Sequence, residues 1–89
     1  MTNEEFKEFA KKVVMEDTQN IHKDLTITLD DVMIVWSAKV LQNYKVIMAN
    51  RVKGDRHIWE ITHNGDKNET YVDMYDKVYN KKIEHGRKA

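Results

Sequence analysis

The chain has no cysteine, no proline and only three glycines among its 89 residues. The lack of cysteine excludes disulfides, thiolate catalysis and Cys-ligated zinc, and it fits a reducing compartment. Because few residues here interrupt regular structure, each glycine is informative, and Gly54, Gly65 and Gly86 lie where turns or element ends are expected. No repeat, linker or low-complexity segment divides the sequence. We therefore expect residues 1–89 to form a single domain.

The sequence also lacks an excess of either charge, with fifteen Lys and Arg residues against fifteen Asp and Glu residues. This balance excludes the strongly basic footprint of a dedicated nucleic-acid binder and the acidic excess of a DNA mimic. No apolar run reaches the length of a membrane span, and the start "MTNEEFKEFAKKVV" is acidic and amphipathic, unlike a signal peptide. We expect a soluble, unprocessed protein of a cytoplasm, with no membrane partner.

The first segment predicts a helix that begins at Thr2. Thr2 and Glu5 have the spacing of a capping box. Apolar residues then recur at helical spacing and form one stripe: Phe6, Phe9, Ala10, Val13 and Val14. The opposite face is charged, so we expect the stripe to face the core.

A second helix is expected over "DDVMIVWSAKVLQN", residues 30–43. Its residues are apolar on several faces, as in a central helix, and Asp30 and Asp31 suit a helix N-terminus. The β-branched run from Val32 to Trp36 leaves a strand open as the alternative. Before it, Thr28 and Asp31 have capping-box spacing, while residues 25–29 alternate as a short extra strand would.

Two strands, "YKVIMANR" and "HIWEITHN", are expected to form a hairpin through "VKGD". Either a two-residue turn at Lys53–Gly54 or a four-residue loop over 53–56 places Tyr44, Val46 and Met48 on one face with Trp59 and Ile61. A loop of odd length would split this apolar set across both faces. We therefore expect Trp59 to lie in the core beside Val46 or Met48.

The last segment, "ITHNGDKNETYVDMYDKVYN", predicts a strand, a turn and then a helix. Asn64–Gly65 is a turn dipeptide, and Asp66 with Glu69, or Asn68 as a later cap, suits the start of a helix. An apolar arc follows at helical spacing and ends before Gly86: Tyr71, Val72, Met74, Tyr75, Val78, Tyr79 and Ile83. The expected fold is a small α+β domain in the order helix, helix, strand, strand, helix, with the hairpin packed against the helices.

The stretches "DDVMIVWSAKVLQNYK" and "WEITHNGDKNETYVDMYDKV" resemble a family of short proteins of unknown function encoded by phages and prophages of Gram-positive bacteria. The shared pattern runs from Asp30 to Lys45 and from Glu60 to Tyr75, about the C-terminal two-thirds of the chain. The resemblance implies a phage accessory protein that acts in a bacterial cytoplasm. It implies no catalytic or binding residue.

The residues that carry chemistry form no catalytic, cofactor or metal constellation. His57 and His63 are six apart on an expected strand, which separates them by about 20 Å, too far to share one ion. Asp66 and Asn68 do not have the ligand order of a calcium loop. Ser37 is the only serine, and it lies within an apolar segment. We therefore expect a protein that is not an enzyme and needs no cofactor or metal.

Binding is the remaining class of function. Ile47 and Ile58 are expected on the hairpin face away from Trp59, where they contact a partner or pack under a helix. Open strand edges invite pairing with another chain, as in a weak homodimer, although a monomer is also compatible. Lys81, Lys82 and Arg87 give the C-terminal end a basic character that suits nucleic acid. A host protein is the expected partner, for instance a defence or replication component that is inhibited, and nucleic acid is the alternative.

Overall fold

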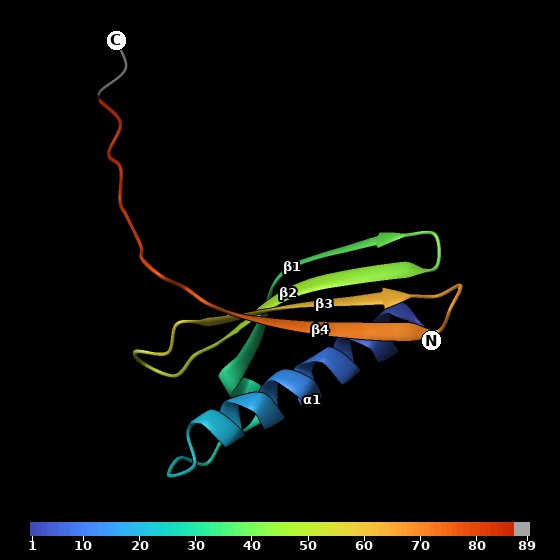
Figure 1. Ribbon diagram of the computed structural model, residues 1–89, viewed down its shortest axis with the longest axis horizontal. Coiled ribbons are helices and arrows are strands. Elements are labelled where there is room, and N and C mark those ends of the chain that lie inside the picture. The colour runs from blue at the N-terminus through green and yellow to red at the C-terminus, as the bar shows by residue number, and fades with distance from the viewer. Residues whose placement is uncertain (87–89) are drawn as a thin grey trace.

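A computed structural model describes residues 1–86, which form one helix and one four-stranded antiparallel sheet (Figure 1). The elements, in order, are α1 (Asn3–Ile21), the short 3-10 helix η1 (Leu29–Asp31), β1 (Val32–Val40), β2 (Asn43–Asn50), β3 (His57–Asn64) and β4 (Glu69–Asp76). The strands lie side by side in chain order, and α1 packs against them. The α+β class is confirmed, but the expected order with three helices is wrong.

The capping box predicted at the start of α1 is present. The Thr2 hydroxyl accepts a hydrogen bond from the Glu5 backbone N–H at 3.1 Å, and the Thr2 N–H donates to the Glu5 carboxylate at 2.8 Å. The bonds from Thr2 lower the pKa of Glu5. The side chains that α1 buries are four apart: Phe6, Ala10, Val14 and Thr18. Phe9 lies at the edge of this row and stays exposed, because the contact with the sheet is narrower than the apolar stripe.

The predicted register of the central hairpin is confirmed. Val46 pairs with Ile61 and Met48 with Trp59, so all four side chains face α1 and are buried. The connection is longer than expected, because β2 ends at Asn50 and β3 begins at His57. Its six residues are still an even number, which preserves the predicted facing of both strands.

The expected second helix over residues 30–43 is wrong, since this segment is η1 followed by β1. Val32, Ile34 and Val35 are β-branched, and such side chains pack well on a pleated surface while they lose freedom in a helix. The Thr28–Asp31 box does form, with the Thr28 N–H donating to Asp31 at 2.8 Å, but it caps only η1. Residues 25–28 form no strand.

The expected last helix is also wrong. Residues 69–76 are β4, and the described residues that follow, 77–86, are extended and without regular structure (Figure 1). Asn64–Gly65 does start a turn, in which the Asn64 side chain accepts hydrogen bonds from the N–H groups of Asp66 (3.0 Å) and Lys67 (3.3 Å). Asp66 therefore belongs to a hairpin turn, not to a helix cap. Its carboxylate accepts a hydrogen bond from the Gln42 side chain.

Candidate interaction surface

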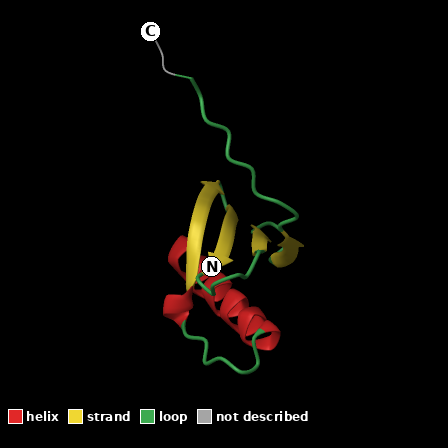
Figure 2. Cartoon of the chain, turned by 90° about the vertical axis from the view of Figure 1, so that its left-hand side faces the viewer, coloured by secondary structure: helices red, strands yellow, loops and turns green. Residues whose placement is uncertain are grey.

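The two faces of the sheet have different neighbours. One face packs against α1 and carries the core side chains of β2 and β3, Val46, Met48, Trp59 and Ile61. We call the opposite one the outer face. Figure 2 shows α1 on one side of the strands only, and no element of residues 1–86 covers the outer face. The side chains that point outward from the strands therefore form a surface of the molecule.

Apolar side chains run across the outer face from β1 to β4. The register places Met33, Ala49, Ile58 and Tyr75 in one row of paired residues, and Trp36 beside Ile47 in the next. We call these six residues the outer stripe. Trp36 is 50% exposed and Tyr75 is 54% exposed, while Ile47 and Ile58 are partly covered by their neighbours. Large aromatic side chains that remain half-exposed in a contiguous patch are typical of interaction sites.

A β-bulge in β1 is the reason that Trp36 belongs to this stripe. Ile34 pairs with Met48, which faces α1, whereas Trp36 pairs with Ile47, which faces outward, and the register shifts between them at Val35. In a regular strand, side chains two apart such as Ile34 and Trp36 would point to the same face. The bulge therefore directs Trp36 away from the core and onto the outer face.

The charged side chains of the outer face are mostly acidic. Lys45 lies 3.4 Å from the Glu60 carboxylate, Asp73 pairs with Glu60 across the strands, and Glu69 lies farther along β4. One cation against three carboxylates gives the strands of this face a net charge of −2. Tyr71 donates a hydrogen bond to Glu69, which raises the pKa of the Tyr71 hydroxyl. A face of this sign repels phosphate, so it fits a protein partner better than a nucleic acid.

Two of the residues predicted for an interaction surface, Ile47 and Ile58, lie on the outer face. The helix that was the alternative cover for them is absent, since the expected last helix is β4. Lys81 and Lys82 lie in the extended segment after β4 and are exposed, with Lys82 2.9 Å from Glu84. The structure does not bring these lysines into the outer stripe. Arg87 lies outside the described residues.

Sequence reasoning missed Trp36, Tyr71 and Tyr75 because it placed all three on helices. A signal was available in "TYVDMYD", where Tyr71, Asp73 and Tyr75 alternate with Val72 and Met74. That period of two is the pattern of a strand. The same residues also fit the period of a helix, and a helix was predicted.

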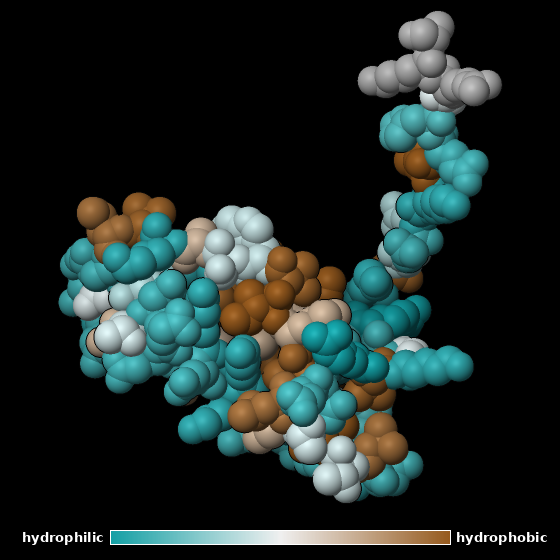
Figure 3. Space-filling view, turned by 180° about the vertical axis from the view of Figure 1, so that it is seen from behind, coloured by the Kyte–Doolittle hydropathy of each residue, from teal (hydrophilic) through white to brown (hydrophobic). Residues whose placement is uncertain are grey.

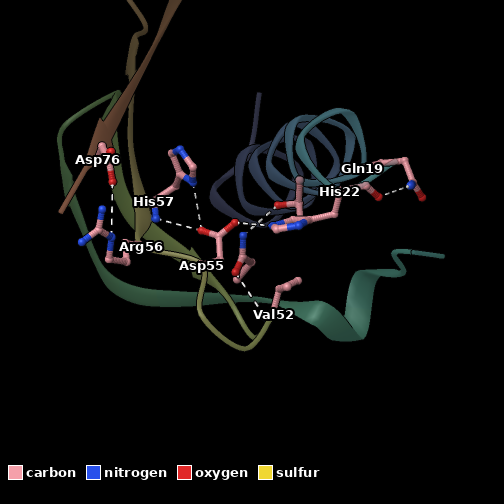
Figure 4. Close-up of polar contacts among 9 residues, drawn as sticks. Gln19, His22, Val52, Asp55, Arg56, His57 and Asp76 are labelled. Atoms are coloured by element: carbon pink, nitrogen blue, oxygen red, sulfur yellow. Dashed lines mark hydrogen bonds and ion pairs between the residues drawn. The ribbon is translucent and has the colours of Figure 1, made fainter. Parts of the chain in front are cut away.

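Asp55 is the most perturbed titratable group, and it joins the loop before β3 to the end of α1 (Figure 4). Its side chain is 1% exposed, and it accepts hydrogen bonds from the His22 ring at 2.6 Å, the His57 N–H at 2.8 Å and the His57 ring at 3.0 Å. Burial raises the pKa of this carboxyl, but these bonds, together with one from Asn50, outweigh burial and lower the pKa to about 2. All of these contacts join parts of the fold to one another, so the cluster stabilises the loop.

The remaining histidine of the core, His63, also serves packing. It is 4% exposed, stacks on Tyr44 and lies tilted against Phe6, while its Nδ1 lies 2.8 Å from the Thr70 hydroxyl. Among residues 1–86, no three His, Asp or Glu side chains are grouped so that they could hold a metal ion. Within the same residues no helix is long and apolar enough to cross a membrane.

A protein-family model described as "Family of unknown function (DUF6275)" matches residues 4–85. The match includes α1, all four strands and most of the extended segment, so the relationship concerns the whole fold. No curated protein and no solved structure matches the chain. The family match assigns no role to any residue, and the function has to be argued from the surface itself.

Proposed function

The chain belongs to the DUF6275 family, and from that premise we propose that it is a non-enzymatic accessory protein that binds another protein through its outer stripe. The observation that carries the proposal is the uncovered sheet face, whose outer stripe includes two half-exposed aromatic side chains, Trp36 on β1 and Tyr75 on β4. The net charge of −2 on the strands of that face supports a protein over a nucleic acid. The resemblance to phage and prophage proteins supports a bacterial host protein as the partner, in the cytoplasm, with inhibition of a defence or replication component as the outcome.

Geometry supports the outer stripe as the centre of such a contact. Ile47 and Ile58 sit between the two aromatic side chains, and Lys45 with Glu60 borders them. An apolar centre containing Trp or Tyr, surrounded by polar groups, is the usual composition of a protein interface. At the end of the stripe, a shallow depression lined by Met33, Ala49, Ile58, Arg56 and Lys77 offers a place for a partner side chain.

The test is affinity capture from a bacterial host lysate treated with nuclease, followed by titration of the captured protein against variants. Tyr75→Ala should weaken binding by tenfold or more, since truncating a central aromatic anchor costs about 2 kcal/mol or more. Tyr79→Ala is the matched control, because Tyr79 is 75% exposed but lies in the extended segment. Equal loss of binding in both variants, or no loss in either, would contradict the proposal.

Nucleic-acid binding is the second candidate, and a different observation favours it. Lys77, Lys81 and Lys82 are exposed in the segment after β4, with Tyr79 available to stack on a base. Affinity that depends on phosphate contacts falls steeply between low and physiological salt. Binding of a single-stranded oligonucleotide that disappears on removal of this segment would establish this function in place of the first.

A further inference from the structure

We propose that two copies of this chain associate through the free edge of β1, with Trp36–Val40 of one copy pairing antiparallel with Trp36–Val40 of the other. The pairing would join two sheets into one and place the outer stripes of the two copies side by side. It does not depend on the proposed function, because it uses the backbone edge of β1 and not the centre of the outer face.

The composition of the two sheet edges selects β1. β4 carries three carboxylates in eight residues, Glu69, Asp73 and Asp76, so pairing β4 with itself brings like charges together. β1 carries one charged residue in nine, Lys39. The Lys39 ammonium lies 5.9 Å from the centre of the Tyr44 ring, on the α1 side of the sheet, so it does not reach over the free edge. Long, apolar and uncharged edges are the ones that pair with another chain.

The described residues leave this edge open. β1 contacts β2 and α1, and no other element of residues 1–86 lies along its far side. Figure 3 shows apolar side chains projecting at the end of the molecule where β1 turns into β2, and Val40 and Leu41 there are 68% and 77% exposed. Within one copy these two side chains remain largely exposed.

Backbone geometry fixes which residues of β1 can pair. The turn between Val40 and Asn43 has two residues, so Ser37 and Lys39 direct their backbone N–H and C=O groups to the free edge. The bulge at Val35 interrupts regular pairing beyond Trp36. The usable ladder is therefore Trp36–Val40, about 17 Å long.

Of the registers possible within that ladder, only one avoids opposing like charges and also pairs side chains that fit together. Pairing about Lys39 would oppose two ammonium groups, and pairing about Ser37 would oppose Lys39 to the bulged Val35. Pairing about Ala38 places Ser37 opposite Lys39 and Trp36 opposite Val40 on the outer face. Aromatic and β-branched side chains across a strand pair are favourable. Ala38, the smallest residue of the ladder, then lies on the twofold axis, where the two strands are closest.

The contact is small. A five-residue ladder with two Trp–Val pairs falls below the roughly 800 Å² per partner of a stable complex. The dimer is therefore expected to be weak, with a dissociation constant on the order of 0.1 mM, and to be detectable at high protein concentration.

The test compares charge substitutions at two neighbours of Lys45 on the outer face, by sedimentation velocity over a range of concentrations. Ala38 and Thr62 both pair with Lys45, Ala38 on the edge strand and Thr62 in the interior of the sheet. Ala38→Glu gains an attraction to Lys45 within one copy but opposes two carboxylates across the axis, so the dissociation constant should rise about fivefold or more. Thr62→Glu, with the same new charge, should leave it unchanged.

Mixing gives the decisive result. Ala38→Glu and Ala38→Lys should each associate with themselves more weakly than the wild type does, and an equimolar mixture should form a heterodimer more tightly than either self-associates, because opposite charges then meet at the axis. The proposal is overturned if the wild type stays monomeric at millimolar concentration. It is also overturned if Ala38→Glu still dimerises while Thr62→Glu does not, since the two outer faces would then be stacked on each other.

Discussion

At the scale of single residues, Asp55 holds the loop before β3 in place through three contacts with two histidines. Its pKa of about 2, against an ordinary value of 3.8, means that the folded state favours the charged carboxylate. A carboxyl whose pKa is lower in the folded state contributes stability that is fully present at pH values above its pKa in the unfolded state. That stability is lost as the pH falls through its pKa in the folded state.

We therefore predict that Asp55→Asn lowers the free energy of unfolding at pH 7 by about 2 kcal/mol, the equivalent of the shift in the Asp55 pKa. The difference between wild type and variant should shrink between pH 4 and pH 2, where Asp55 of the wild type becomes protonated. Urea denaturation at pH 7, 5, 4, 3 and 2 measures it. A difference that stays constant over this range would show that the carboxylate charge is not what stabilises the loop.

The two tryptophans provide a second comparison at this scale. Trp59 is fully buried, and its indole N–H donates to Asp17 at 2.9 Å, whereas Trp36 is half-exposed on the outer face. Trp59→Ala should cost about 3–5 kcal/mol, most of the stability of a small domain. Trp36→Ala should cost less than about 1 kcal/mol. Thermal melts followed by circular dichroism decide this, and equal losses in the two variants would refute the assignment of faces.

At the scale of elements, the bulge in β1 determines which face Trp36 joins. Deleting Val35 would remove the extra residue and make Ile34 and Trp36 neighbours in a regular strand, so each would keep its present face. We predict that the deletion variant loses less than about 1 kcal/mol and melts within about 5 °C of wild type. Val35→Ala keeps the residue count and changes a side chain that is mostly exposed, so it should melt within a few degrees of wild type. A deletion variant that melts about 10 °C or more below Val35→Ala would show that Ile34 or Trp36 has lost its present environment.

Elements were predictable where the deciding information is local. The Thr2 capping box and the four-residue spacing from Phe6 to Val14 specify α1 without any distant contact. The faces to which the side chains of the central hairpin point could be assigned from the alternation of apolar and polar residues alone. Residues 30–43 and 69–83 were misread because their apolar residues fit two periods, and the choice depends on strand partners far along the chain. Leu41, with a φ of 56°, and Asn68, with a φ of 52°, form the two turns that make those pairings possible. Neither position is a glycine, the residue that would have indicated a positive φ in the sequence.

The outer stripe was therefore only partly foreseeable. Ile47 and Ile58 were placed correctly on the face away from Trp59, because they belong to the hairpin that was read correctly. Trp36 and Tyr75 could not be placed there until their segments were known to be strands.

At the scale of the whole molecule, the sheet and α1 form the packed part of the described chain, and residues 77–86 extend away from it (Figure 1). One bond connects the start of this segment to the sheet, from the Lys77 N–H to the Arg56 carbonyl at 2.8 Å. We predict that a chain ending at Lys77 melts within about 2 °C of the full chain, because the described residues removed are exposed. A drop of 10 °C or more in differential scanning calorimetry would show that the segment packs on the fold. The same truncated chain should keep β1-edge association.

The order of the elements has a consequence for synthesis. α1 is made first, but its apolar row packs on β2 and β3, and Ile61 follows Phe6 by 55 positions. At about 5–20 residues per second, a ribosome needs roughly 3–11 s to supply the surface that α1 covers. During that interval the apolar row of the nascent helix has no packing partner in the chain, so a chaperone at the exit tunnel can bind it.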